Sequence, residues 1–175
     1  GVPNNRGFDF FYGFNCQRQA HTLYPKHLWK NKEKVWLANE LVVPGTKLQA
    51  GADPMNDSSY ASYSLTDYAP ELMHHEALEF IRSNKDDAFF MYYASPIPHV
   101  PLQAPKRWVD YYHEKFGEED PYDGKKGYFP ARNPRATYAA MVSYLDEQVG
   151  DIVALLKELD LYDNTLIIFT SDNGP

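Results

Sequence analysis

The sequence predicts an α/β domain built on a largely parallel sheet flanked by helices, with a small β-hairpin as an excursion. Two short apolar runs, 88–94 and 165–170, have the length and unalternated composition of strands buried on both faces. Each run follows a segment with helical periodicity. The resulting order of helix, strand, loop, helix and strand is typical of parallel α/β sheets.

The first helix is expected to begin near Thr66 or Asp67, because both side chains are good N-caps. Pro70 is compatible with a first helical turn, whose N–H groups have no partner within the helix. Apolar residues then recur at helical spacing as far as Ile81. The prolines that follow the 88–94 run must end that strand.

The second helix is expected over about 136–159, where apolar residues step by four and three from Tyr138 to Leu159. The segment between the first strand and this helix, 102–134, is predicted to be a partly helical excursion with a long polar loop. Near the start of the chain, 28–30 and 35–37 flank the polar residues 31–34, which predicts a hairpin with a four-residue turn.

The chain has 175 residues, a net charge of −7 and one cysteine. The negative charge argues against a nucleic-acid partner, and a single cysteine excludes an internal disulfide framework. No apolar run is long enough to cross a membrane. The sequence opens without Met and ends one step past a predicted core strand. We therefore expect residues 1–175 to be an internal part of one domain, truncated at both ends.

Candidate ligands follow the two predicted strands, at the sheet edge where parallel α/β proteins bind their substrates. His99 lies five residues past Ala94, and Asp172 and Asn173 come directly after Thr170. The Asp–Asn pair offers the oxygen ligands that Ca²⁺ and Mg²⁺ prefer. Spacing alone favours a simple turn at 172–174, since these residue types form turns for local reasons. His99, taken alone, could be a general acid, a ligand to a substrate anion or a structured loop histidine, and a lone histidine favours the loop interpretation.

The single cysteine and the adjacent histidines 74 and 75 give weaker evidence of function. Cys16 stands in no CxxC motif, so we expect a buried or partly buried free thiol. His74 and His75 are adjacent in the first predicted helix and point about 100° apart, so they cannot clamp one metal ion. Both are expected on the helix surface.

Several segments, taken in order, resemble the sulfatase family of the alkaline-phosphatase superfamily. They are 7–13, 89–102, 138–150 and 163–174. The stretch 15–29 is also similar to bacterial arylsulfatases and N-acetylgalactosamine-6-sulfatase-like enzymes. The resemblance implies a sulfuric-ester hydrolase that acts on aryl or sugar sulfates. It also points to a periplasmic or secreted protein.

The resemblance also implies roles for particular residues. His99 would contact a sulfate oxygen or the leaving group, Asp172 and Asn173 would bind one divalent cation, and His21 would contact the substrate. Ca²⁺ is favoured over Mg²⁺ as that cation. The family's nucleophile is a formylglycine made from the cysteine of a Cys-x-Pro-Ser-Arg motif. Cys16 is followed by Gln-Arg-Gln, so formylglycine and the other metal ligands are expected outside residues 1–175.

Two alternative functions stay open on the sequence. One is a phosphatase or phosphodiesterase of the same superfamily, which would use two metal ions and a Ser or Thr nucleophile. The other is a non-catalytic glycan-binding module with a sulfatase-like fold. The sequence upstream of residue 1 would distinguish them, because it would contain or lack the nucleophile motif.

Overall fold

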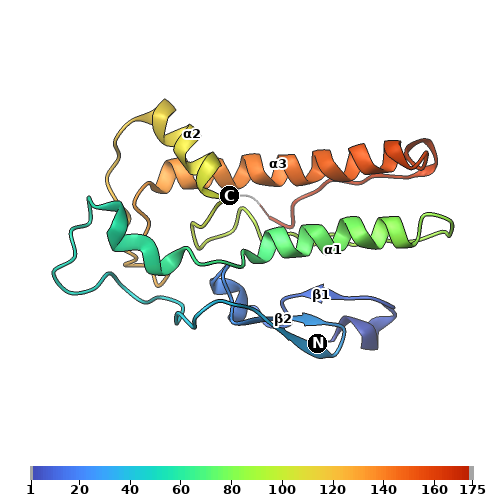
Figure 1. Ribbon diagram of the computed structural model, residues 1–175, viewed down its shortest axis with the longest axis horizontal. Coiled ribbons are helices and arrows are strands. Elements are labelled where there is room, and N and C mark those ends of the chain that lie inside the picture. Colours follow the sequence, from blue (N-terminus) through green and yellow to red (C-terminus); the bar gives the residue numbers. More distant parts are fainter. Residues whose placement is uncertain (1, 174–175) are drawn as a thin grey trace.

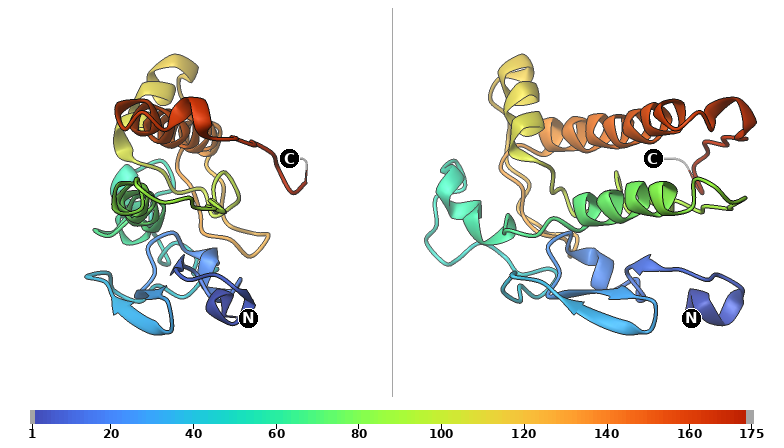
Figure 2. Two further views of the ribbon diagram at one scale, coloured as in Figure 1. Left: turned by 90° about the vertical axis from the view of Figure 1, so that its right-hand side faces the viewer. Right: turned by 45° about the vertical axis from the view of Figure 1, so that its right-hand side comes forward.

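The computed structural model describes residues 2–173 and shows a mixed α/β architecture in layers (Figure 1). Helices α3 (Pro134–Glu158) and α2 (Lys106–Phe116) form one layer, α1 (Ala69–Ser83) lies in the middle, and a small sheet forms the opposite layer. The two further views in Figure 2 show the same separation. Short 3-10 helices connect these parts. They are η1 (Pro3–Arg6), η2 (Gln19–His21), η3 (Asp57–Tyr63) and η4 (Tyr162–Asn164).

The sheet has the strand order β1 (Tyr12–Gly13), β2 (His27–Lys30) and β3 (Glu33–Trp36), with antiparallel neighbours. The predicted hairpin is confirmed, but its turn is shorter than expected. Lys30 pairs with Glu33, so only Asn31 and Lys32 connect the strands. Asn31 adopts a positive φ of 55°, which asparagine tolerates better than most residues. Its side-chain oxygen accepts a hydrogen bond from the Phe11 N–H at 2.9 Å, which fixes the N-terminal segment on the hairpin.

Helix α3 spans 25 residues and confirms the predicted second helix. Helix α1 begins at Ala69, slightly later than the candidate caps Thr66 and Asp67. The cause is Asn39, whose buried side-chain oxygen accepts hydrogen bonds from the main-chain N–H groups of Thr66 (3.1 Å) and Asp67 (2.9 Å). The Asp67 carboxylate accepts from the N–H of Ala38 instead of capping α1. These bonds keep the entry to α1 extended.

Polar contacts fix α1 against α3. The buried Gln148 side chain donates to the carbonyl oxygen of Pro70 at 2.9 Å. His74 is buried, and its Nε2 lies 3.1 Å from the Asp151 carboxylate. The prediction of a surface position for His74 was therefore wrong, because α3 covers that face of α1, whereas His75 is exposed as expected.

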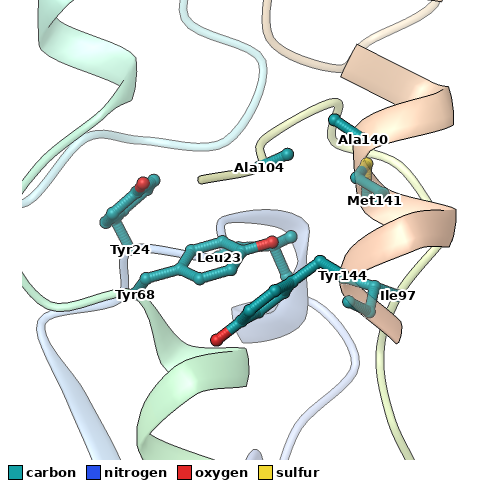
Figure 3. Close-up of a cluster of buried hydrophobic side chains, with 8 residues drawn as sticks. All are labelled: Leu23, Tyr24, Tyr68, Ile97, Ala104, Ala140, Met141 and Tyr144. Carbon is teal, nitrogen blue, oxygen red and sulfur yellow. The ribbon is translucent and has the colours of Figure 1, made fainter. Parts of the chain in front are cut away.

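The main hydrophobic core joins segments that are far apart in the sequence (Figure 3). Its buried members are Leu23, Tyr24, Tyr68, Ile97, Ala104, Ala140, Met141 and Tyr144. Each large apolar side chain buried here contributes about 1.5–3 kcal/mol. Burial also raises the pKa of Tyr24 to about 12, so its phenol stays uncharged in the core. The core thereby fastens the segment after η2 to the segment after 88–94.

The run 88–94 is extended and alternates in exposure, but it pairs with no strand among residues 2–173. Phe89 and Met91 pack beside Ile81, whereas Phe90 and Tyr92 are 75% and 72% exposed. The prediction of burial on both faces was wrong for the described part of the chain. No described strand pairs with the edges of this run, and on its outer face the Phe90 ring meets the Phe8 ring with their centroids 6.2 Å apart.

The run 165–170 departs further from the prediction. Leu166, Ile168 and Phe169 are 86%, 77% and 74% exposed, and the described residues provide no strand partner. The segment doubles back along α3 toward the other end of the helix (Figure 1). The predicted parallel sheet is therefore not formed within residues 2–173, although both runs have the composition of its strands.

Candidate active site

His99 lies in the loop between the 88–94 segment and α2, with its side chain exposed. The loop is anchored on both sides of the histidine. Ile97 is buried in the main core, and Gln103 is buried beneath the loop. The peptide bonds before Pro98 and Pro101 are both cis. The site therefore presents an exposed imidazole on a backbone that packing holds in place.

One hydrogen bond defines the tautomer of His99. Its Nδ1 lies 2.5 Å from the carbonyl oxygen of Val100. Because a carbonyl oxygen only accepts, Nδ1 must be the donor and must carry a proton. Nε2 is then an acceptor in the neutral ring and a donor only in the imidazolium. A proton can leave this side chain toward a substrate only from Nε2, and only in the doubly protonated state.

The structure brings His21 next to His99, as a shared site requires. The two imidazole rings are nearly parallel, with centroids 6.4 Å apart and an interplanar angle of 16°. Tyr128, from the loop before α3, lies 5.4 Å from the His21 ring and 6.1 Å from the His99 ring. The sequence analysis did not single out Tyr128. Its only local signal is the adjacent aromatic pair of Tyr128 and Phe129, in a polar loop that contains glycine.

Gln103 connects the segments that carry the two histidines. Its side-chain oxygen accepts from the N–H of Leu23 at 2.7 Å, and its side-chain amide donates to the carbonyl oxygen of Tyr63 at 2.5 Å. Its own carbonyl oxygen accepts from the Tyr68 hydroxyl at 2.7 Å. Leu23 is two residues from His21, so this buried amide fixes the spacing of the histidine segments. The sequence gives no sign of this role.

The charges around the histidines suit an anion. Within the described residues 2–173, neither His21 nor His99 forms an ion pair with a carboxylate, whereas His74 and His113 both do. An imidazolium without a carboxylate partner can hold a sulfate or a similar anion by a charge-assisted hydrogen bond.

Asp172 and Asn173 lie at the exposed end of the 165–170 segment. The Ser171 hydroxyl donates to the main-chain oxygen of Asn173 at 2.5 Å, which is a local turn contact. Within residues 2–173, no interaction joins Asp172 to His99, and no three His, Cys, Asp or Glu side chains gather closely enough to hold a metal ion. Two oxygen donors fit Ca²⁺ or Mg²⁺ in chemistry, but Ca²⁺ takes six to eight oxygen ligands. Gly174, the third residue of the predicted turn, lies outside the described residues.

Comparison with known proteins shows the family to which the chain belongs. The family model described as Sulfatase matches residues 1–175. The chain belongs to the sulfatase family. It is 33% identical over 174 residues to the uncharacterized sulfatase YdeN of Escherichia coli, covering 98% of this chain and 23% of that protein. It is 31% identical to mouse arylsulfatase J, covering 99% of this chain and 24% of that protein. The sulfatase-family chain thus spans about a quarter of these relatives.

Two solved structures match most of the chain in fold. The crystal structure of Ps i-CgsB superimposes with a TM-score of 0.59 at 26% identity, over 93% of this sulfatase-family chain and 31% of that chain. A second crystal structure of Ps i-CgsB, in complex with k-i-k-neocarrahexaose, matches with a TM-score of 0.57 at 26% identity. No helix among residues 2–173 of the sulfatase-family chain is long and apolar enough to cross a membrane.

Cys16 lies in a surface turn of the sulfatase-family chain. Its thiol is free and exposed, which corrects the prediction of a buried or partly buried cysteine. It lies in the turn that precedes η2, where its main-chain oxygen accepts hydrogen bonds from the N–H groups of Gln19 (3.0 Å) and Ala20 (3.4 Å).

Proposed function

We propose that the complete protein is a sulfatase that hydrolyses aryl or sugar sulfate esters, and that residues 1–175 are an internal part of its single catalytic domain. The family match over the whole chain carries this proposal. The pairing of His21 with His99, neither of which meets a carboxylate among residues 2–173, supports it, because a sulfate ester is an anion. The nucleophile, formylglycine in this proposal, lies outside these residues.

His99 acts on the leaving group or on a sulfate oxygen. As the sulfur–oxygen bond to the alcohol breaks, negative charge develops on the alcohol oxygen, and the Nε2 proton of the imidazolium passes to it. The Val100 carbonyl holds the Nδ1 proton throughout and orients the ring. His21, beside it, contacts the sulfate group and stabilises its charge.

Asp172 and Asn173 bind one divalent cation, Ca²⁺ in preference to Mg²⁺. The Asp172 carboxylate provides negative charge, and the Asn173 side chain provides a neutral carbonyl oxygen. When bound, the cation neutralises the sulfate oxygens. The remaining oxygen ligands come from other parts of the same domain, since two donors fall short of the number that Ca²⁺ takes.

The exposed apolar runs fit the same proposal. In the complete domain, 88–94 and 165–170 become strands of a largely parallel sheet, and their exposed faces are covered. This places His99 and Asp172 past the carboxyl ends of their strands, where parallel sheets bind ligands. We also propose that the protein is periplasmic or secreted, in keeping with its family. Human N-acetylgalactosamine-6-sulfatase, 34% identical over 57% of this chain, favours a sugar sulfate among the possible substrates.

The test is sulfate release by the complete protein. Nitrophenyl sulfate, N-acetylgalactosamine 6-sulfate and the matching phosphate esters are each incubated with the protein, with and without a chelator. We expect hydrolysis of at least one sulfate ester that is lost with the chelator. Turnover of phosphate esters alone would indicate a phosphatase, and sugar binding without turnover would indicate a glycan-binding module.

Residues 1–175 alone provide a second test. We expect no turnover of nitrophenyl sulfate by this chain, because the nucleophile and other metal ligands are not part of it. Turnover that disappears in Cys16→Ala would contradict both the proposed domain limits and the assignment of no role to Cys16.

A further inference from the structure

We propose that Tyr128 is a specificity-determining residue of the active site, whose ring packs against the ring of the leaving alcohol. This assignment rests on the proposed sulfatase function and adds the part of the site that recognises the alcohol. Tyr128 is the only aromatic side chain outside the histidine pair whose ring meets both His21 and His99 within the described residues 2–173. Its ring is partly exposed, so one part of its surface is available to a ligand.

Local packing holds the Tyr128 backbone in place. Tyr122 and Ala131 exchange two main-chain hydrogen bonds of 2.9 Å, which close the loop around residue 128. The next residue, Phe129, is buried and packs on the Tyr63 ring at 5.1 Å. The backbone at Tyr128 is therefore held by the Tyr122–Ala131 bridge and by the buried Phe129 side chain.

The turn opposite Tyr128 is also sterically fixed. Gly124 has a φ of +76°, and a Cβ built there would lie 2.7 Å from the main-chain oxygen of Tyr128. Only glycine allows this close approach. An aromatic side chain on a backbone that is held in this way loses less conformational entropy when a ligand packs against its ring, which favours binding.

The chemistry of the neighbours places the alcohol at Tyr128. The two imidazoles attract the anionic sulfate group, and in the proposed mechanism Nε2 of His99 lies at the oxygen between sulfur and the alcohol carbon. The carbon atoms of the alcohol begin one bond beyond that oxygen. Tyr128 borders both imidazoles and offers the apolar surface on which a sugar or aryl ring can rest.

The experiment compares the complete protein with its Tyr128→Ala, Tyr128→Leu and Tyr128→Phe variants. The kcat/KM is measured for nitrophenyl sulfate and N-acetylgalactosamine 6-sulfate, which separate aryl from sugar rings. The inhibition constant of inorganic sulfate, which has no alcohol, is measured beside them. Tyr138→Ala is the matched control, because Tyr138 is 41% exposed on α3 and its ring pairs with no other among the described residues.

We expect Tyr128→Ala and Tyr128→Leu to lower kcat/KM by about tenfold for the preferred ring, the size of a lost aromatic contact. The inhibition constant of sulfate should stay within about twofold, as should every value for Tyr128→Phe and Tyr138→Ala. Tyr128→Leu keeps an apolar side chain, so it remains informative if Tyr128→Ala unfolds, which circular dichroism would show.

Two outcomes would overturn the assignment, and they are distinguishable. An active protein whose kcat/KM is unchanged in Tyr128→Ala and Tyr128→Leu, or whose sulfate inhibition weakens in parallel, would remove Tyr128 from alcohol recognition and leave the proposed function standing. A protein that releases no sulfate from either ester would contradict the proposed function, and the assignment would fall with it.

Discussion

The two halves of the candidate active site are built differently. The segment with His99 is held by a buried isoleucine on one side and by the buried Gln103 on the other. The segment with Asp172 follows a run in which Leu166 is 86% exposed, and no strand among residues 2–173 pairs with it. The imidazole half is thus organised by contacts within this part of the chain. The half that we propose to bind the metal depends on contacts that the described residues do not supply.

This difference explains why similar sequence patterns gave different outcomes. A short apolar run is stabilised as a strand only when neighbouring strands satisfy its main-chain hydrogen bonds and cover its faces. The 88–94 run has one face packed on the helices, which is enough to place the loop that follows. Within the described residues, the 165–170 run has neither a neighbouring strand nor a covered face. Its apolar composition alone therefore does not bury it.

The largest effect is expected at the metal half. In the complete protein, Asp172→Ala should abolish Ca²⁺ binding and lower kcat by on the order of 10⁴-fold, because a bound cation contributes several kcal/mol of transition-state stabilisation. Asp172→Asn should weaken Ca²⁺ binding and keep the fold. Titration calorimetry and sulfate release check both. Asp163→Ala, at an exposed carboxylate of η4, is the control. Normal Ca²⁺ affinity in Asp172→Ala would show that residues 172–174 form only a turn and do not bind the metal ion.

The imidazole half should show a smaller loss that depends on the substrate. His99→Ala should lower kcat by about 10²–10⁴-fold, the range for a positioned acid–base group. The loss should be smaller for nitrophenyl sulfate, whose leaving group needs less protonation than a sugar alcohol. His75→Ala, at an exposed histidine of α1, should leave kcat unchanged. Equal losses for both substrates would make His99 a sulfate-binding residue, and no loss would leave it a loop residue.

The link between the two histidine segments can be broken at Gln103. In Gln103→Ala the Leu23 N–H and the Tyr63 carbonyl lose their partners in a buried region. Each buried unpaired group costs about 1–3 kcal/mol, so the free energy of unfolding should fall by about 2–6 kcal/mol. Urea denaturation of the complete protein measures this. An unchanged midpoint would show that Gln103 does not hold these segments together.

The smallest effect is expected where α2 packs on α3. Arg107 donates two hydrogen bonds to the Glu147 carboxylate, at 2.7 and 2.6 Å. They hold the pKa of Glu147 below its ordinary value, helped by the Trp108 N–H and opposed by partial burial. The ionised carboxylate therefore stabilises the fold above the unfolded-state pKa of about 4.3. This contribution is lost as the pH falls through the lower pKa of the folded state.

Glu147→Gln tests this pH dependence. The pair is partly exposed, so the substitution should cost only about 1 kcal/mol of unfolding free energy at pH 7. The difference from the wild type should shrink when urea denaturation is repeated below about pH 4. Activity at pH 7 should not change. A difference that is the same at both pH values would show that the ion pair does not cause it.

The sequence predicted the elements that depend on local pattern. The hairpin, α1 and α3 follow from turn residues and helical spacing. The family and the candidate His99 follow from motifs in order. The hairpin turn was misjudged because Asn31 uses a positive φ that shortens it. Tyr128 and Gln103 were missed because their roles come from contacts across the fold, which no spacing within one segment reveals.

The most direct test of this account is a crystal structure of the complete protein with Ca²⁺ and inorganic sulfate. We expect one ion bound by the side chains of Asp172 and Asn173, with a sulfate oxygen on it. Nε2 of His99 should lie within about 3.2 Å of the same sulfate, a hydrogen-bonding distance. Strands 88–94 and 165–170 should then run parallel in one sheet. An Asp172 at the opposite edge of the sheet from His99, with the Ca²⁺ bound elsewhere, would contradict the shared active site.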